Sequence, residues 1–200
     1  MMRVIIGIVL SIAATTALAQ GDAARGKTLT PVCAACHGPD GNSPAGTFPS
    51  LAGQNEGYLV KQLVDIKNGD RVSPQMTGLL DNMSEQDFED MAAWYASQEP
   101  EIGAAKQDLV ALGEEIYRAG IARKSIAACT ACHSPTGAGN APASFPALSG
   151  QWPEYVEAQL KAFRDGERTN DGEGKMMRDV ARDMSDDEIK AVSSYVFGLH

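Results

Sequence analysis

The chain has 200 residues, with 26 acidic and 17 basic side chains, and carries a net charge of −9 at pH 7. This charge disfavours nucleic acids and anionic membrane surfaces as partners. The length allows one large or two small domains. Only 6% of the residues are aromatic, so few large rings are available to fill a core. The chain also has four cysteines, three histidines and eight methionines, side chains that could hold a non-protein group in the core.

Residues 1–19 have the pattern of a secretory signal peptide that is cleaved. Arg3 gives a short positive start, an apolar stretch follows from Val4, and the small residues Ala17 and Ala19 form a cleavage site. The apolar stretch is too short to span a bilayer, and nothing after Ala19 prolongs it, which argues against an uncleaved anchor helix. We therefore expect export to the periplasm and no transmembrane span. A weak contact with a membrane stays open.

A short helix is expected before each of two cysteine motifs, over residues 22–30 and about 108–118. Each motif reads C-x-x-C-H, the attachment signature of a c-type haem. In this chemistry the two thiols add across the haem vinyl groups and the adjacent histidine binds the iron. Two copies predict two covalently bound haem c groups. The predicted attachment residues are Cys33, Cys36 and His37 in the first copy, and Cys129, Cys132 and His133 in the second.

Three other interpretations of the cysteines compete with haem attachment. An exported protein with four cysteines is expected by default to form two disulfides, but this leaves the histidine after each pair unexplained. A thioredoxin-like redox pair needs a βαβ pattern, and the sequence has no alternating strand runs. A single zinc site would have to join cysteine pairs separated by residues 37–128, a gap far longer than the usual spacing. Haem attachment is therefore preferred.

The chain contains an internal repeat. Residues 48–54 (Phe-Pro-Ser-Leu-Ala-Gly-Gln) match residues 145–151 (Phe-Pro-Ala-Leu-Ser-Gly-Gln) at an offset of 97. An amphipathic helix follows in each copy, from Tyr58 and from Tyr155, and a glycine ends it. Further on the offset becomes 101, so the second copy has a loop longer by about four residues near residues 170–175. Insertions of this kind belong at the surface.

The last helix of each half begins at a serine. Ser84 lies three residues before Asp87, and Ser185 lies three residues before Glu188. The second pair is a capping box and the first is a near relative of one. The sequence thus predicts an all-α protein of two tandem domains, because each half reads as helix, C-x-x-C-H, loop, helix, loop, helix. The expected domains are residues 20–97 and 107–200, joined by a linker at residues 98–106 that contains proline and glycine.

The histidine count limits the sixth ligand of each iron. His37 and His133 are needed as proximal ligands, which leaves only His200, so two bis-histidine haems are impossible. The sixth position is therefore empty, or filled by a methionine, or filled by an unusual donor such as lysine.

Repeat symmetry sorts the methionines. Met91 lies on the apolar face of its helix, and Met83 and Met184 each directly precede a capping serine, the position of a hydrophobic staple. Met76 and Met177 also match each other, each eight residues before that serine, on a loop that can lay a thioether over the haem. We predict Met76 as a ligand of the first iron and Met177 as a ligand of the second.

Taken together, the C-x-x-C-H motifs, the Phe-Pro-x-Leu-x-Gly-Gln segments and the loop at residues 76–78 resemble the dihaem cytochrome c4 family, in which two class I cytochrome c domains are fused. The resemblance covers essentially the whole mature chain. It implies two haem domains related by an approximate two-fold axis, with Met76 and Met177 at the axial positions. It also implies that the carbonyls of Pro49 and Pro146 accept a hydrogen bond from the proximal imidazole. The alternative that these prolines only turn the chain stays open.

The resemblance implies an electron carrier and not an enzyme, because a filled sixth position leaves no site for a substrate. In related proteins the donors are membrane quinol-oxidising cytochrome complexes and the acceptors are terminal oxidases. Two alternatives remain, a dihaem peroxidase and an electron-transfer subunit of a periplasmic dehydrogenase. The repeated polar residues Gln62, Gln159, Arg71 and Arg168 are candidates for binding haem propionates, for joining the domains or for plain solvent exposure.

Overall fold

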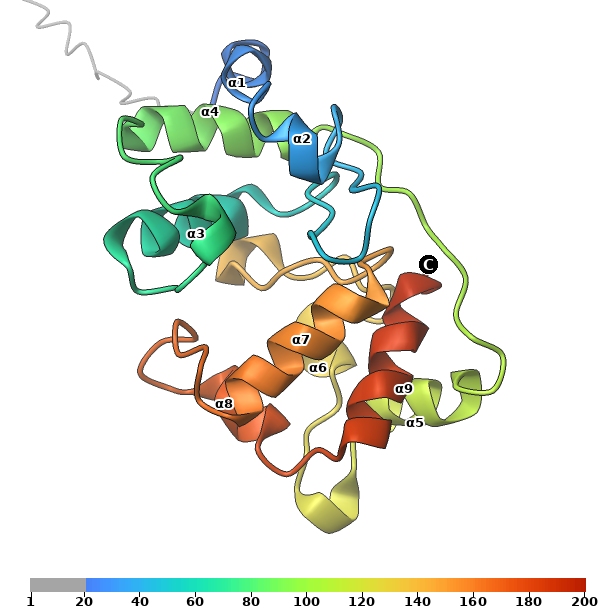
Figure 1. Ribbon diagram of the computed structural model, residues 1–200. Coiled ribbons are helices and arrows are strands. Elements are labelled where there is room, and N and C mark those ends of the chain that lie inside the picture. Colours follow the sequence, from blue (N-terminus) through green and yellow to red (C-terminus); the bar gives the residue numbers. More distant parts are fainter. Residues whose placement is uncertain (1–20) are drawn as a thin grey trace, which may run out of the picture.

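The computed structural model describes residues 21–200, so the predicted signal peptide lies outside the described residues. In that range every regular element is helical, apart from two isolated β-bridges, which confirms the predicted all-α class. The helices form two lobes stacked one above the other, α1 to α4 in the first and α5 to α9 in the second (Figure 1). The helices are α1 (Ala23–Leu29), α2 (Ala34–His37), α3 (Glu56–Asn68), α4 (Glu85–Ala96), α5 (Val110–Ala119), α6 (Thr130–His133), α7 (Pro153–Arg164), α8 (Met176–Ala181) and α9 (Asp186–Phe197), with short 3-10 turns η1 (Pro74–Met76), η2 (Ala122–Lys124) and η3 (Ala141–Ala143).

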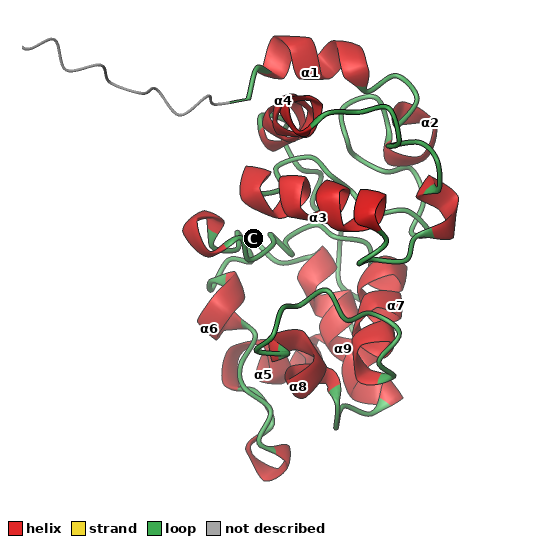
Figure 2. Ribbon diagram, turned by 90° about the vertical axis from the view of Figure 1, so that its left-hand side faces the viewer, coloured by secondary structure: helices red, strands yellow, loops and turns green. Residues whose placement is uncertain are grey.

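In each lobe the first and last helices cross at a glycine, and Figure 2 shows α1 lying across α4. A Cβ at Gly26 of α1 would lie 1.9 Å from the carbonyl oxygen of Asp90 in α4. A Cβ at Gly113 of α5 would lie 2.4 Å from the carbonyl oxygen of Ala191 in α9. Atoms cannot approach so closely, so only glycine lets these two helix backbones meet.

The final helices begin at complete capping boxes in both lobes. The Asp87 carboxylate accepts from the Ser84 backbone N–H at 2.7 Å, and the Glu188 carboxylate accepts from the Ser185 N–H at 2.8 Å. The serine hydroxyls accept in return from the N–H of the acidic residue. The first box is thus as complete as the second, which goes beyond the near relative expected from sequence.

The methionines that precede these serines belong to the apolar cores. Met83 packs in a cluster with Phe88, and the buried Met184 packs in a cluster with Ile189. These are the contacts of a hydrophobic staple, as predicted.

The segment before each final helix differs between the lobes, and here the expectation of a loop at Met177 is wrong. The first lobe has only the turn η1, whereas Met177 lies in the helix α8. The physical reason lies in the insertion near residues 170–175. The Asp171 carboxylate accepts from the backbone N–H of Arg178 at 2.9 Å and from its guanidinium at 2.7 Å, so it caps the first turn of α8. A residue of the insertion therefore caps α8, whose own residues match positions 75–80 of the first copy, where no such helix forms.

A second difference lies between α5 and α6. Ile121 and Ile126 form an antiparallel bridge around η2, so a small hairpin precedes the second cysteine motif. Lys124 and Arg123 in this hairpin pair with the buried carboxylate of Glu188 at 2.7 Å and 3.0 Å. The hairpin is thereby held against the start of α9.

The apolar cores of the two lobes are of unequal size. The second lobe has one cluster of 11 buried side chains that spans α5, α7 and α9. The first lobe has two separate clusters of three buried side chains each. None of the helices between residues 21 and 200 is long and apolar enough to cross a membrane.

Candidate functional site

One continuous cavity of about 1160 Å³ runs between the lobes and into each of them. Its lining is largely apolar, and both separate core clusters of the first lobe border it. The predicted haem-attachment and ligand residues from both halves of the sequence meet in this cavity. They are Cys33, Cys36, His37, Pro49 and Met76 from the first lobe, and Cys129, Cys132, His133, Pro146 and Met177 from the second.

Both histidines of the cysteine motifs are buried and oriented in the same way. Nδ1 of His37 lies 2.9 Å from the carbonyl oxygen of Pro49, and Nδ1 of His133 lies 2.9 Å from that of Pro146. A carbonyl oxygen only accepts hydrogen bonds, so Nδ1 must carry the proton. Nε2 of each ring is then left with a free lone pair, which is the form that binds a metal.

The protonation of these rings agrees with a ligand role. Burial lowers the pKa of His37 and of His133, and the hydrogen bond to the proline carbonyl only partly offsets this effect. The imidazoles are therefore neutral near pH 7, as iron ligation requires.

The four cysteines form no disulfide. Burial raises the pKa of the Cys33 thiol, and it raises that of Cys129 to about 11. A thioredoxin-like pair would need a lowered pKa. The two pairs also lie in different lobes, on α2 and α6, and the described residues contain no cluster of three or more His, Cys, Asp and Glu side chains fit to hold a metal ion. The competing disulfide, redox-pair and zinc interpretations thus find no support.

Several methionines border the cavity, and their burial differs. Met91 and Met184 are 2% and 4% exposed and belong to the cores, whereas Met176 is 49% exposed. Met76 and Met177 are half-buried at the cavity wall. Met76 packs beside the cluster of Leu80, Phe88 and Met91.

Two glutamines clamp the lobes together in a reciprocal way. Gln54 accepts from the Ala147 N–H at 2.7 Å and donates to the Ala147 carbonyl at 2.9 Å. Gln151 accepts from the Ser50 N–H at 2.9 Å and donates to the Ser50 carbonyl at 2.9 Å. Each glutamine thus binds the same repeat position in the other lobe. Gln54 and Gln151 are the last residues of the repeated segments 48–54 and 145–151, so the repeat marked them as matching positions. Their role in joining the lobes was visible only in the structure.

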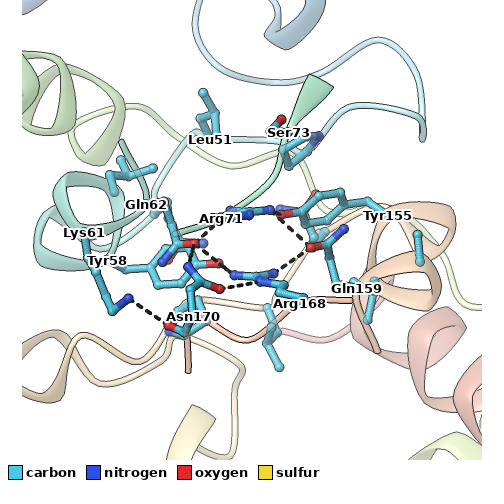
Figure 3. A pocket seen from close by; sticks show the side chains of 18 of the residues that line it. Leu51, Tyr58, Lys61, Gln62, Arg71, Ser73, Tyr155, Gln159, Arg168 and Asn170 are labelled. Atoms are coloured by element: carbon cyan, nitrogen blue, oxygen red, sulfur yellow. Dashed lines mark hydrogen bonds between the residues drawn. The ribbon is translucent and has the colours of Figure 1, made fainter. Parts of the chain in front are cut away.

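Next to the clamp, the repeated arginines reach across the interface (Figure 3). Arg71 donates to Gln62 of its own lobe at 2.8 Å and to Tyr155 of the other lobe at 2.9 Å. Arg168 donates to Gln159 at 2.7 Å and to Gln62 across the interface at 2.9 Å. Of the three roles left open for these residues, the structure shows the joining of the domains.

The same network carries one asymmetry and one electrostatic effect. Asn170, from the insertion, donates to Gln62 at 3.0 Å and to Asp65 at 2.6 Å, so part of the inserted loop belongs to the interface between the lobes. No sequence signal pointed to Asn170, because its position has no counterpart in the first copy.

Burial alone would raise the pKa of Tyr58, but the guanidiniums of Arg168 and Arg71 outweigh it and lower that pKa.

The residues present in each lobe fit a c-type haem. The cavity is apolar, two thiols and a neutral imidazole face it, and the buried hydroxyl of Tyr95 beside Cys33 has no hydrogen-bond partner in the described part of the chain.

Two helical domains with this donor set define a dihaem c-type cytochrome. The family model "Cytochrome c" matches residues 23–99 and again residues 110–199. A cytochrome c4 from Pseudomonas aeruginosa is 51% identical over 201 residues, covering 100% of both chains. The chain therefore belongs to the cytochrome c4 family.

Two further similarities complete the comparison. The crystal structure of reduced recombinant cytochrome c4 from Pseudomonas stutzeri matches with a TM-score of 0.89 at 49% identity, over 90% of this chain and 100% of that one. A thiosulfate dehydrogenase electron acceptor from Stutzerimonas stutzeri is 41% identical over 168 residues, which is 82% of this chain and 76% of that protein. The predicted fold of two fused cytochrome c domains and the predicted cofactors, two covalent haem c groups, are confirmed. The protein is a dihaem electron-transfer cytochrome.

Proposed function

We propose that the chain is a periplasmic carrier that accepts and passes on one electron per haem and catalyses no bond chemistry. The observation that carries this proposal is the matched pair of imidazoles. His37 and His133 each commit Nδ1 to a proline carbonyl and border one shared cavity. A c-type haem supplies reversible one-electron chemistry at its iron when it is bound. A symmetric pair of such sites suits storage and transfer of electrons, whereas a peroxidase needs one site that differs.

In this proposal the chain's own residues have distinct tasks. The thiols of the two cysteine pairs would hold the haem groups covalently, and His37 and His133, oriented by Pro49 and Pro146, would ligate the irons. Met76 and Met177 would supply the second protein ligand of each iron. Two observations support the assignment of Met76 and Met177: they match each other in the repeat, and both are half-buried at the cavity wall. The other matched pair, Met83 and Met184, is assigned to the hydrophobic staples. The glutamine clamp keeps the two sites adjacent, which favours transfer between them.

The proposed partners are redox proteins. The net charge of −9 favours encounter with basic docking patches. By the resemblance, the donor is a membrane quinol-oxidising cytochrome complex and the acceptor a terminal oxidase. The relative named as a thiosulfate dehydrogenase electron acceptor supports a second kind of donor, a periplasmic dehydrogenase. Export by residues 1–19 places these encounters in the periplasm.

A redox titration with haem quantification tests the carrier function. We expect two haems per chain, two one-electron steps, and in the ferric protein the weak near-infrared absorption of sulfur-to-iron charge transfer. Absence of that absorption would remove methionine ligation. Peroxide turnover at enzymatic rates would favour the peroxidase alternative, and isolation in a stable stoichiometric complex with a dehydrogenase would favour the subunit alternative.

The individual ligands are tested by Met76→His and Met177→His. Each variant is expected to lower one reduction potential and leave the other in place, because imidazole favours the ferric iron more than thioether does. An unchanged potential in Met76→His would point to Met83, and in Met177→His to Met176 or Met184.

A further inference from the structure

Each lobe has a buried tyrosine beside its haem-attachment motif, but these tyrosines, Tyr95 and Tyr117, come from opposite helices. The second lobe also buries Tyr195, whose ring centre lies 5.6 Å from that of Tyr117. Tyr95 lies on α4, the last helix of the first lobe, whereas Tyr117 lies on α5, the first helix of the second lobe. They are 4% and 0% exposed. Aligned on the crossing glycines, Thr30 takes the position of Tyr117; aligned on the capping serines, Val196 takes that of Tyr95. The lobes thus fill the same region in different ways.

The two hydroxyl groups have different fates. Tyr117 donates to the backbone carbonyl of Ser134 at 2.7 Å, so its hydrogen-bonding capacity is used inside the protein. Tyr95 Oη is buried and has no partner among the described residues. Buried hydroxyls are almost always hydrogen-bonded, so an unpartnered one beside a cofactor site needs an explanation.

The surroundings of Tyr95 contain two possible acceptors. Cys33 packs against the buried cluster of Leu59, Ala92 and Tyr95 next to the cavity. Burial raises the pKa of Tyr95, the neighbouring Cys33 raises it further, and the side chain of Thr30 opposes this. The Thr30 hydroxyl is itself buried and donates to the Lys27 carbonyl at 3.1 Å. Donation to Lys27 leaves the lone pairs of the Thr30 oxygen free, so the Tyr95 hydroxyl has two possible acceptors, this oxygen and the Cys33 sulfur.

Haem attachment changes what the Cys33 sulfur can do. When the thiol adds across a vinyl group, its sulfur bonds to the vinyl carbon next to the haem ring and its hydrogen moves to the terminal vinyl carbon. The addition consumes no oxidant. The sulfur then has lone pairs and no hydrogen, so it can only accept. In the second lobe Tyr117 also lies near Cys129, but its hydroxyl hydrogen is bound to the Ser134 carbonyl and is not free for the sulfur.

We propose that Tyr95 Oη–H donates a hydrogen bond to the thioether sulfur of Cys33 and thereby raises the reduction potential of the first haem alone. A donor aimed at the sulfur places positive charge density beside the macrocycle and withdraws electron density from it. Both effects stabilise the reduced state. Tyr95 acts as a positioning residue that tunes one of two otherwise matched sites. The inference rests on haem attachment at Cys33 and is independent of the sixth ligand and of the partner proteins.

The test compares Tyr95→Phe with Tyr117→Phe in the holoprotein by spectroelectrochemical titration. Tyr95→Phe is expected to lower one of the two midpoint potentials, by roughly a threefold change in the ratio of oxidised to reduced protein, or about 28 mV. Tyr117→Phe is expected to lower stability and leave both midpoints in place. Unchanged midpoints in Tyr95→Phe, or an equal shift of both, would overturn the proposal.

Two further measurements separate the competing explanations. Thr30→Val removes the other acceptor and should leave the midpoints unchanged; a shift as large as that of Tyr95→Phe would assign the hydrogen bond to Thr30. Resonance Raman spectra of the unaltered holoprotein in H2O and D2O should show a shift in one C–S stretching band, and its absence would contradict the contact even where a variant fails to fold. A haem count of one per chain would instead contradict attachment, and with it the proposed function.

Discussion

The two lobes keep the same support for the proximal histidine and differ in what surrounds it. The histidine–proline contact, the glycine crossing and the capping box recur in both, at matching repeat positions. The hairpin before the motif, the helix α8 and the origin of the buried tyrosine do not recur. The comparison teaches that duplication preserved the groups that orient the buried histidine of each C-x-x-C-H motif, while the surrounding segments became free to change.

The lobes also differ in how far they can pack without the cofactor. Members of all three clusters border the cavity, but the second lobe has a contiguous cluster of 11 buried side chains, whereas the first lobe has two separate clusters of three. The first lobe therefore depends more strongly on haem for its core.

Removal of one haem-attachment site should have the largest effect on stability and should show whether the first lobe depends more strongly on haem than the second. The double change Cys33→Ala and Cys36→Ala is expected to abolish stable haem binding in the first lobe and to cost roughly 3 kcal/mol or more of its local stability. The matched change Cys129→Ala and Cys132→Ala should leave more protection in its own lobe. Hydrogen exchange followed by mass spectrometry measures both, and equal loss in the two lobes would contradict the comparison.

The crossing glycines offer the next test. Gly26→Ala and Gly113→Ala should each destabilise the protein by about 1–3 kcal/mol through overpacking, in spite of the better helix propensity of alanine. The cost should be larger at Gly26, where the added Cβ would lie 1.9 Å from a carbonyl oxygen, than at Gly113, where the distance is 2.4 Å. Urea denaturation of the two holoproteins gives the order, and the reverse order would show that the first crossing relaxes more easily.

The interface should respond symmetrically. Gln54→Ala and Gln151→Ala each strip two hydrogen bonds from backbone groups of the other lobe, which should cost about 1–2 kcal/mol apiece. Asn170→Ala, which removes the one unsymmetrical member of the arginine network, serves as the comparison and should cost less. Thermal unfolding followed at the haem absorption and by circular dichroism measures these changes. A large difference between the two glutamines would break the proposed equivalence.

The smallest expected effect concerns the first capping box and its dependence on pH. Hydrogen bonds from the Ser84 N–H and hydroxyl, with a further one from Arg25, lower the pKa of Asp87 to about 2 from the usual 3.8. A lowered pKa in the folded state gives stability that is present above pH 3.8 and is lost as the pH falls toward 2. Asp87→Ala should therefore cost about 1 kcal/mol at pH 7 and almost nothing near pH 2. A cost that does not change with pH would contradict this.

Much of the fold could be predicted because the informative patterns are local and occur twice. The motif of Cys33, Cys36 and His37 spans five residues, and each serine capping box spans four residues. Aligning the copies then separated staple methionines from candidate ligands. The Tyr58 and Tyr155 helices and their glycine ends followed from the same alignment and agree with α3 and α7.

The contacts that depend on tertiary structure could not be predicted. The partners of Gln54 and Arg71 in the other lobe lie 84 to 93 positions away in the sequence, and nothing in either half indicates which face meets the other. The loop expected at Met177 is a helix because Asp171 caps it, and an inserted residue has no repeat partner to reveal its role. The sequence also gives no sign that Tyr95 is buried near Cys33 with an unpartnered hydroxyl, because this depends on how the helices pack.

The reciprocal glutamine clamp has one more consequence. Position 54 binds position 147 and position 151 binds position 50, so the contact is isologous, the kind that closes a two-fold dimer of identical subunits. Residues 99–106, which contain no helix, tether its two halves. A tether of this length fixes a high effective concentration of one half around the other. The concentration of one half around the other is therefore independent of how dilute the protein is, and a single translation product always delivers the two haem domains in equal numbers.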